Sequence, residues 1–202
     1  MYVLIPAYQP DARLPRLILE LHRADSAMRI VVVDDGSGEE YREIFDASRT
    51  AGAHVISYEG NRGKGYALRA GFTYIYDRAQ SLGINDCVVT ADADGQHTLV
   101  DIFRVGQACA MSNQTVLGVR EFVGHVPACS RIGNTATSGL FWLATGWKLK
   151  DTQTGLRAFP IDLLPTLIDI EGDRYEYELR VLLQLAKYRH PVTQIPIETI
   201  YE

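Results

Sequence analysis

Short apolar runs alternate with amphipathic helical patterns over the first 119 residues. The runs are rich in Val and Ile and are bounded by Gly, Pro or Asp, which is typical of buried strands. Between them, apolar positions recur at helical spacing, as at Leu14, Leu17 and Leu21. This alternation predicts an α/β fold with a mostly parallel, doubly wound sheet. The predicted strands cover residues 2–5, 29–33, 54–58, 86–91 and 115–119.

Beyond residue 119 the pattern is less regular, although no repeat or linker divides the chain. We therefore predict a single domain over residues 1–202. Loops are expected over 120–130 and 151–155, helices over 131–145, 160–168 and 175–188, and strands over 156–159 and 194–201. The helix over 131–145 carries Phe141 and Trp142, which we interpret as core residues or as a surface for a partner.

Composition narrows the class of protein. The chain is 47% hydrophobic and 22% charged, as expected for an ordinary globular protein, and its net charge of −5 argues against binding to nucleic acid. Cys87, Cys109 and Cys129 are odd in number and lack C-x-x-C spacing, so they predict neither a disulfide framework nor a zinc site. We interpret them as packing thiols in a reducing compartment.

Targeting and membrane signals are not evident in the sequence. A predicted strand follows Met1 directly, and the longest apolar run, around residues 139–144, is far too short to cross a bilayer. From these features we expect a soluble, cytoplasmic protein.

Polar loops follow four of the predicted strands. In a right-handed parallel sheet all four emerge at the same edge, which predicts one active site there. The loops are Pro6-Ala7-Tyr8, Asp34-Asp35-Gly36-Ser37, Asn61-Arg62-Gly63-Lys64 and Asp92-Ala93-Asp94.

The Asp92-Ala93-Asp94 loop places two carboxylates directly after a buried strand. Carboxylate oxygens are ligands for hard cations, and a cation relieves the repulsion between neighbouring carboxylates. The spacing therefore suggests a divalent metal that holds a diphosphate. A turn in which Asp94 or Thr98 caps the next helix is the simpler alternative. His97 is either a third ligand or an ordinary loop histidine.

The other loops are open to two explanations each. Asp34 and Asp35 are explained well enough as turn residues, but their position after a strand also suits a contact with a base or ribose. The glycine-rich loop before Lys64 lacks the spacing of a Walker sequence, yet its amides and Lys64 suit an anion. A solvated helix start explains it equally well.

Later in the chain, three arginines are candidates for phosphate binding, because the guanidinium fork matches phosphate geometry. They are Arg120, Arg131 and Arg157. The alternative is that all three are ordinary solvated surface residues. Glu176 and Glu178 stand at the start of a predicted helix, where we interpret them as complementing the helix dipole.

Five motifs together resemble those of family 2 glycosyltransferases, in the same order. The resemblance covers essentially the whole chain and is strongest to the branch of dolichyl- or polyprenyl-phosphate mannose and glucose synthases. The motifs are Ile5-Pro-Ala-Tyr8, Val33-Asp-Asp-Gly-Ser37, Asn61-Arg-Gly-Lys-Gly65, Ala91-Asp-Ala-Asp-Gly-Gln-His97 and Asp151-Thr-Gln-Thr-Gly-Leu-Arg157.

This resemblance implies a GT-A fold, a nucleotide diphosphosugar donor such as a UDP- or GDP-hexose, a Mg²⁺ or Mn²⁺ ion, and inversion at the anomeric carbon. It implies a donor-binding half over residues 1–119 and an acceptor-binding half over 120–202. By the same resemblance, the donor is bound by Pro6, Ala7, Tyr8, Asp34, Lys64 and Asp92, and the metal by Asp92, Asp94 and Gln96.

For the acceptor, the resemblance implies that Arg120 and Arg131 bind the phosphate of a polyprenyl phosphate. Asp94, Asp151 and Arg157 are the implied catalytic residues, the last two facing the sugar and diphosphate. A lipid phosphate is already an oxyanion and needs no general base, whereas a sugar hydroxyl needs one, for which Asp151 is the first candidate.

Alternatives remain open at this stage. The acceptor is either a polyprenyl phosphate or the hydroxyl of a polysaccharide or other glycan, and a non-catalytic scaffold that binds nucleotide sugars is a third possibility. Relatives of this branch commonly continue into amphipathic or transmembrane helices. We therefore expect a catalytic domain at the cytoplasmic face of the membrane, anchored by a further segment or a separate partner, or else a soluble acceptor.

Overall fold

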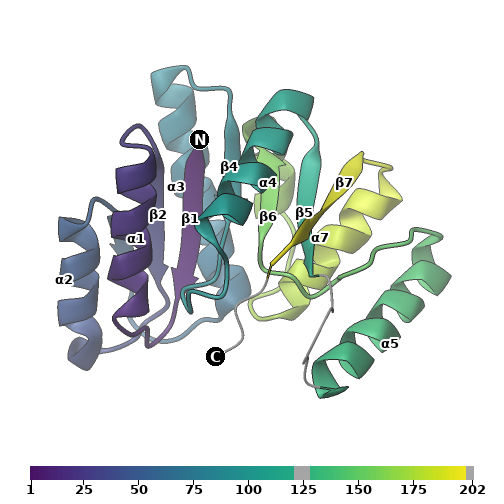
Figure 1. Ribbon diagram of the computed structural model, residues 1–202, viewed down its shortest axis with the longest axis horizontal. Coiled ribbons are helices and arrows are strands. Elements are labelled where there is room, and N and C mark those ends of the chain that lie inside the picture. The colour runs from purple at the N-terminus through teal and green to yellow at the C-terminus, as the bar shows by residue number, and fades with distance from the viewer. Residues whose placement is uncertain (121–127, 199–202) are drawn as a thin grey trace.

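A seven-stranded sheet forms the centre of the molecule in the computed structural model (Figure 1). The structure describes residues 1–120 and 128–198, and side chains over 1–120 and 137–198. The strands are β1 (Tyr2–Ala7), β2 (Arg29–Asp34), β3 (His54–Ser57), β4 (Cys87–Thr90), β5 (Thr115–Arg120), β6 (Arg157–Pro160) and β7 (Val192–Ile197). Their order across the sheet is β3-β2-β1-β4-β6-β5-β7.

Strand β6 is antiparallel to both of its neighbours, β4 and β5, whereas the other pairs are parallel. Its register pairs Val88 with Phe159, and Val116 with Ala158. The structure thus confirms the predicted α/β fold with a mostly parallel sheet. Because β6 runs backwards, it begins at the edge where β4 and β5 end.

Helices cover both faces of the sheet (Figure 1). Alternate residues along β1 point to opposite faces, so Tyr2 and Leu4 belong to one core cluster, and Val3 and Ile5 to the other. The first cluster includes residues of α3, α6 and α7, and the second includes residues of α1, α2 and α4. The helices are α1 (Arg13–Ala24), α2 (Arg42–Thr50), α3 (Lys64–Leu82), α4 (Leu99–Ser112), α5 (Ala128–Thr145), α6 (Leu164–Ile168) and α7 (Glu176–Lys187).

Local sequence signals set several helix ends. The Thr98 hydroxyl caps α4 by accepting a hydrogen bond from the Asp101 amide at 3.1 Å. At the other end of α4, Asn113 adopts a left-handed conformation, as Gly83 does after α3. Thr98 was one of the two cap candidates identified in the sequence, and the structure confirms it as the cap.

Three predicted boundaries were wrong. Helix α5 already begins at Ala128, inside the predicted loop, and β7 begins at Val192, two residues early. The helix expected over 160–168 is divided into a 3₁₀ turn, Ile161–Leu163, and α6. Residues 199–201 of the predicted last strand lie outside the described residues.

Two further features bear on the sequence predictions. Cys87 and Cys109 are buried free thiols, and the Cys129 side chain lies outside the described residues. Over the described ranges, 1–120 and 128–198, none of the helices combines the length and apolarity needed to cross a membrane.

Candidate active site

The loops after β1, β2, β3 and β4 meet at the carboxyl edge of the sheet, where they line a cavity of about 500 Å³. All four predicted loops contribute residues, as expected for a doubly wound sheet. The start of α7 closes a further side through Arg174 and Tyr175. From the predicted donor residues, the lining includes Pro6, Ala7, Tyr8, Lys64 and Asp92, and it also includes the predicted metal ligand Asp94.

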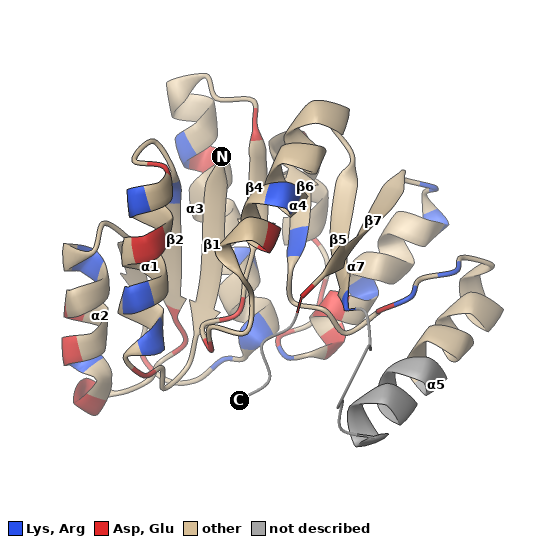
Figure 2. Cartoon of the chain, in the orientation of Figure 1, with Lys and Arg blue, Asp and Glu red and all other residues tan. Residues whose placement is uncertain are grey.

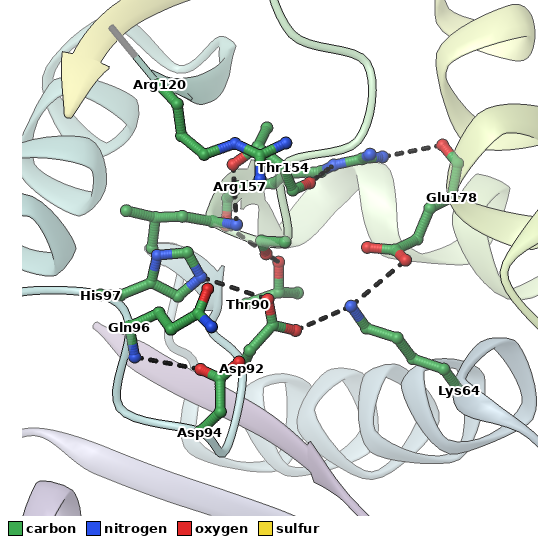
Figure 3. Close-up of polar contacts among 12 residues, drawn as sticks. Lys64, Thr90, Asp92, Asp94, Gln96, His97, Arg120, Thr154, Arg157 and Glu178 are labelled. Atoms are coloured by element: carbon green, nitrogen blue, oxygen red, sulfur yellow. Dashed lines mark hydrogen bonds and ion pairs between the residues drawn. The ribbon is translucent and has the colours of Figure 1, made fainter. Parts of the chain in front are cut away.

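Lys64 lies between two carboxylates (Figure 3). Its Nζ is 2.7 Å from Oδ1 of Asp92 and 3.2 Å from Oε2 of Glu178, which comes from α7. Burial alone would lower the pKa of Lys64, but the charges of Asp92 and Glu178 outweigh burial and raise it. Lys64 is therefore a permanent cation at the cavity wall.

Asp92 is held by a second contact, because Nε2 of His97 lies 3.3 Å from its Oδ2. Burial alone would raise the pKa of Asp92, but the His97 hydrogen bond and the Lys64 charge hold it well below its usual range. His97 is 8% exposed, and its Nδ1 has no hydrogen-bond partner among the described atoms. Asp92 therefore stays ionised at neutral pH.

Gly155 leaves room for the Asp92 side chain because a glycine has no Cβ. A Cβ at Gly155 would lie 2.2 Å from Oδ2 of Asp92. The Gly155 carbonyl also accepts a hydrogen bond of 2.8 Å from the Thr90 hydroxyl. The loop before β6 is thus fixed directly against the carboxylate, which brings the two halves of the chain together at the cavity.

Asp94 and Gln96 are next to Asp92 in Figure 3, and Oδ1 of Asp94 accepts a hydrogen bond from the Gln96 amide at 3.0 Å. Among the described side chains, no group of three or more His, Cys, Asp or Glu residues is placed to hold a metal. Asp92 and Asp94 nevertheless line one cavity, and their oxygens are ligands of the type that Mg²⁺ and Mn²⁺ prefer. The two carboxylates, Asp92 and Asp94, fit such an ion if a further ligand such as a diphosphate completes its coordination.

Asp35, rather than Asp34, lines this cavity. The Asp35 carboxylate is 3% exposed and accepts hydrogen bonds from the Tyr58 hydroxyl and the Arg62 and Gly63 amides. Burial, together with the Asp35 hydrogen bond, raises the pKa of Tyr58, which therefore remains a donor. Asp35 thus fixes the loop that carries Lys64.

Asp34 accepts a hydrogen bond from the Ser37 amide at 2.9 Å and lines a separate cavity of about 590 Å³. The structure does not bring Asp34 together with Lys64 and Asp92 in one cavity, and its role toward the donor stays a prediction.

Two glycines of the Asn61–Gly65 motif allow the start of α7 to approach. A Cβ at Gly63 would lie 2.3 Å from the Asp173 carbonyl oxygen, and one at Gly65 would lie 2.6 Å from that of Gly172. The Tyr66 amide donates a hydrogen bond of 3.0 Å to the Asp173 carbonyl. These contacts place Arg174, Tyr175 and Glu178 at the site, none of which the sequence suggested as a site residue.

Arg120 and Asp151 form a second centre, of which Figure 3 labels Arg120. Nε of Arg120 lies 2.6 Å from Oδ2 of Asp151, and a terminal guanidinium nitrogen lies 3.1 Å from Oδ1. The Asp151 side chain is fully buried, and Oδ1 also accepts a hydrogen bond from the Gln153 amide at 2.9 Å. Both carboxylate oxygens of Asp151 are therefore occupied.

Arg157 is 2% exposed, and its guanidinium donates to the carbonyl oxygens of Thr152, Thr154 and Glu178 at 2.8–3.2 Å. These contacts tie the loop before β6 to α7, which is a structural task. A role of Arg157 at the diphosphate stays a prediction. Arg131 lies in α5, its side chain is outside the described residues, and its role also stays a prediction.

The sequence pattern of the family described as Glycosyl transferase family 2 matches residues 2–105, which is half of the chain. The chain belongs to glycosyltransferase family 2. Residues 2–105 contain the loops that line the cavity of about 500 Å³, from Pro6 to Asp94. This membership confirms the predicted family and makes the protein a glycosyltransferase.

Curated relatives of this glycosyltransferase act in lipid-linked sugar chemistry. It is 31% identical to the UDP-N-acetylglucosamine–dolichyl-phosphate N-acetylglucosaminyltransferase of Methanococcus voltae, covering 100% of this chain and 86% of the relative. It is 27% identical to the polyprenol monophosphomannose synthase of Mycolicibacterium smegmatis, covering 96% of this chain and 75% of that protein.

Among solved structures, the glycosyltransferase is similar to the glucosyl-3-phosphoglycerate synthase of Mycobacterium tuberculosis, crystallised with Mn²⁺, UDP and phosphoglyceric acid. The TM-score is 0.72 at 18% identity, covering 100% of this chain and 70% of that one. At this identity the likeness shows the fold alone, and it confirms the predicted GT-A fold.

Proposed function

We propose that this glycosyltransferase moves a hexose, glucose or mannose, from a UDP- or GDP-sugar to a polyprenyl phosphate, with a Mg²⁺ or Mn²⁺ ion and with inversion at the anomeric carbon. The observation that carries the proposal is the Arg120–Asp151 ion pair, because Asp151 begins the loop 151–157 that lies against Asp92 at Gly155. We assign the Arg120 cation, held by the fully engaged Asp151 carboxylate, to the acceptor phosphate.

On the donor side, Lys64 supplies a permanent positive charge for the diphosphate, and the ionised Asp92 and its neighbour Asp94 both line the cavity with carboxylate oxygens. When bound, the metal would neutralise negative charge that develops on the departing nucleoside diphosphate. Exposed Tyr8 and Tyr175 stand at the cavity wall, where their rings suit stacking on a base or sugar. The relatives named above support a nucleotide-sugar donor.

On the acceptor side, a phosphate oxygen attacks the anomeric carbon and the nucleoside diphosphate leaves from the opposite face. A phosphate monoester is anionic at neutral pH, since its second pKa is about 6. It therefore needs alignment rather than a general base. Asp151 fits this requirement, because both of its oxygens are held by Arg120 and the Gln153 amide, and it fixes the orientation of the Arg120 guanidinium. The names of the curated relatives support a lipid phosphate acceptor.

The test is a transfer assay with labelled UDP-glucose, UDP-N-acetylglucosamine or GDP-mannose and a short, water-soluble polyprenyl phosphate, with Mn²⁺ or with EDTA. We expect labelled lipid phosphate only with metal. Transfer to sugar hydroxyls with no reaction on the lipid phosphate would overturn the proposed acceptor. Transfer that is undiminished in EDTA would overturn the metal requirement.

A further inference from the structure

Exposed apolar and aromatic side chains gather beside lysines and arginines at the C-terminal ends of α5 and α7. Leu140 is 68% exposed, Leu143 79%, Trp142 49% and Tyr188 57%. Helix α5 packs against α7 and stands out from the body of the protein (Figure 1). We call this region the basic–aromatic surface, and it consists of Leu140, Trp142, Leu143, Lys148, Lys150, Lys187, Tyr188 and Arg189.

Cations and aromatic rings alternate on this surface. Nζ of Lys148 lies 5.7 Å from the ring centre of Trp142, and Nζ of Lys187 lies 5.4 Å from that of Tyr188. A cavity of about 420 Å³ between the two helix ends is lined by both Trp142 and Arg189. Trp and Tyr beside Lys and Arg are the side chains that membrane–water interfaces favour, because their apolar parts enter the lipid while the polar ends stay hydrated.

The charge of this surface is opposite to that of the whole chain. The net charge is −5, yet residues 122–150 and 179–197 contain no Asp or Glu. Figure 2 shows Lys and Arg along the loop that leads from α5 toward β6 and at the end of α7. The surface therefore attracts an anionic partner, and it disfavours a second copy of itself, which would bring the same positive charges face to face.

We propose that the basic–aromatic surface docks this glycosyltransferase onto an anionic lipid bilayer, with Leu140 and Leu143 entering the lipid. An apolar face flanked by Lys and Arg has the chemistry of an interfacial helix, which lies in the headgroup region rather than crossing the bilayer. The purpose of docking rests on the proposed function. Lys150 is followed directly by Asp151, the partner of Arg120, so a lipid held at this surface has its phosphate near the acceptor side.

The experiment is flotation of the whole protein with vesicles of phosphatidylcholine alone or of equimolar phosphatidylcholine and phosphatidylglycerol. We expect binding to the anionic vesicles, little to the neutral ones, and release at high salt. The variant L140S/L143S should bind about tenfold less or weaker still, since two apolar side chains no longer enter the lipid. The double variant Lys148→Ser/Lys187→Ser should also bind the anionic vesicles at least about tenfold more weakly, because each lysine near the surface contributes about 1 kcal/mol.

The matched control is Val100→Ser with Met111→Ser on α4, because these apolar residues are 66% and 89% exposed but lie outside the basic–aromatic surface. This pair should bind vesicles as the wild type does. Equal binding to both vesicle types would overturn the proposal. Wild-type binding of the anionic vesicles by L140S/L143S would also overturn it. So would a loss of vesicle binding in the α4 control as large as that in L140S/L143S.

A dimer in sedimentation velocity that L140S/L143S dissolves, without any vesicle binding, would assign the surface to a second copy instead. The vesicles contain neither donor nor polyprenyl phosphate, so this result is independent of the sugar-transfer assay. Transfer to a soluble acceptor with no vesicle binding would refute docking alone.

Discussion

A single methyl group added at Gly155 is expected to disable the donor site while the fold persists. In Gly155→Ala the new Cβ would lie 2.2 Å from Oδ2 of Asp92, where ordinary contact begins at 3.4 Å, so the two must separate by about 1.2 Å. The loop resists retreat because its carbonyl is bound by the Thr90 hydroxyl at 2.8 Å. A displacement of about 1 Å at a reacting centre costs roughly 100-fold in rate.

The assay is the initial rate of sugar transfer at varied donor concentration, with thermal unfolding measured on the same samples. We expect kcat/KM to fall about 100-fold, with a loss of stability of about 1–3 kcal/mol from overpacking. The matched control is Gly139→Ala in α5, where a Cβ would have no neighbour within 4 Å. Its rate should be unchanged. Wild-type kcat/KM in Gly155→Ala would refute the idea that the loop before β6 fixes Asp92 for catalysis.

Three other changes test the charged centres. Lys64→Met should weaken the binding of a nucleoside diphosphate, measured by calorimetry, about 10- to 100-fold, because a charge-assisted contact is lost. The control variant Arg62→Met, at an exposed position, should have little effect on this binding. Asp151→Asn should lower the free energy of unfolding in urea by about 3–5 kcal/mol, since Arg120 loses its buried partner. If Asp151→Asn left the stability unchanged but lowered kcat strongly, Asp151 would instead act as a general base. The control for the stability measurement is Asp169→Asn, at an exposed position. The pKa of Asp92 is lower in the folded than in the unfolded protein, so its stabilising effect is complete above about pH 3.9 and is lost as pH falls toward the folded pKa. The unfolding temperature should therefore fall more steeply in acid for the wild type than for Asp92→Asn, and equal slopes would contradict the assignment.

Local patterns were sufficient to predict the fold of residues 1–119. The apolar runs before Asp34 and Asp92 identified β2 and β4, and the alternation with helices then brought their loops to one edge. The direction of β6 was not predictable, because four buried residues carry no signal of strand orientation. The choice between Asp34 and Asp35 was equally hidden, since it depends on which carboxylate meets the amides of a loop almost thirty residues away.

Glu178 was missed because its partner Lys64 is far away in the sequence. A signal did exist: Glu178 falls in register with the buried positions Val181, Leu182 and Leu185 of α7, where an acid is out of place. A charged residue within an apolar helical stripe requires a buried partner of opposite charge. Which cation serves as that partner emerges only from the packing of α7 against the start of α3.

The reversed direction of β6 determines the course of the segment between β5 and β6. The segment between β5 and β6 leaves the sheet at the edge where β5 ends and returns to the same edge, because β6 starts there. Its length and composition are therefore not constrained by a crossover from one end of the sheet to the other. Insertions in this excursion therefore need not displace β5 or β6 in the sheet, and Lys64 and Asp92 belong to other elements of the chain.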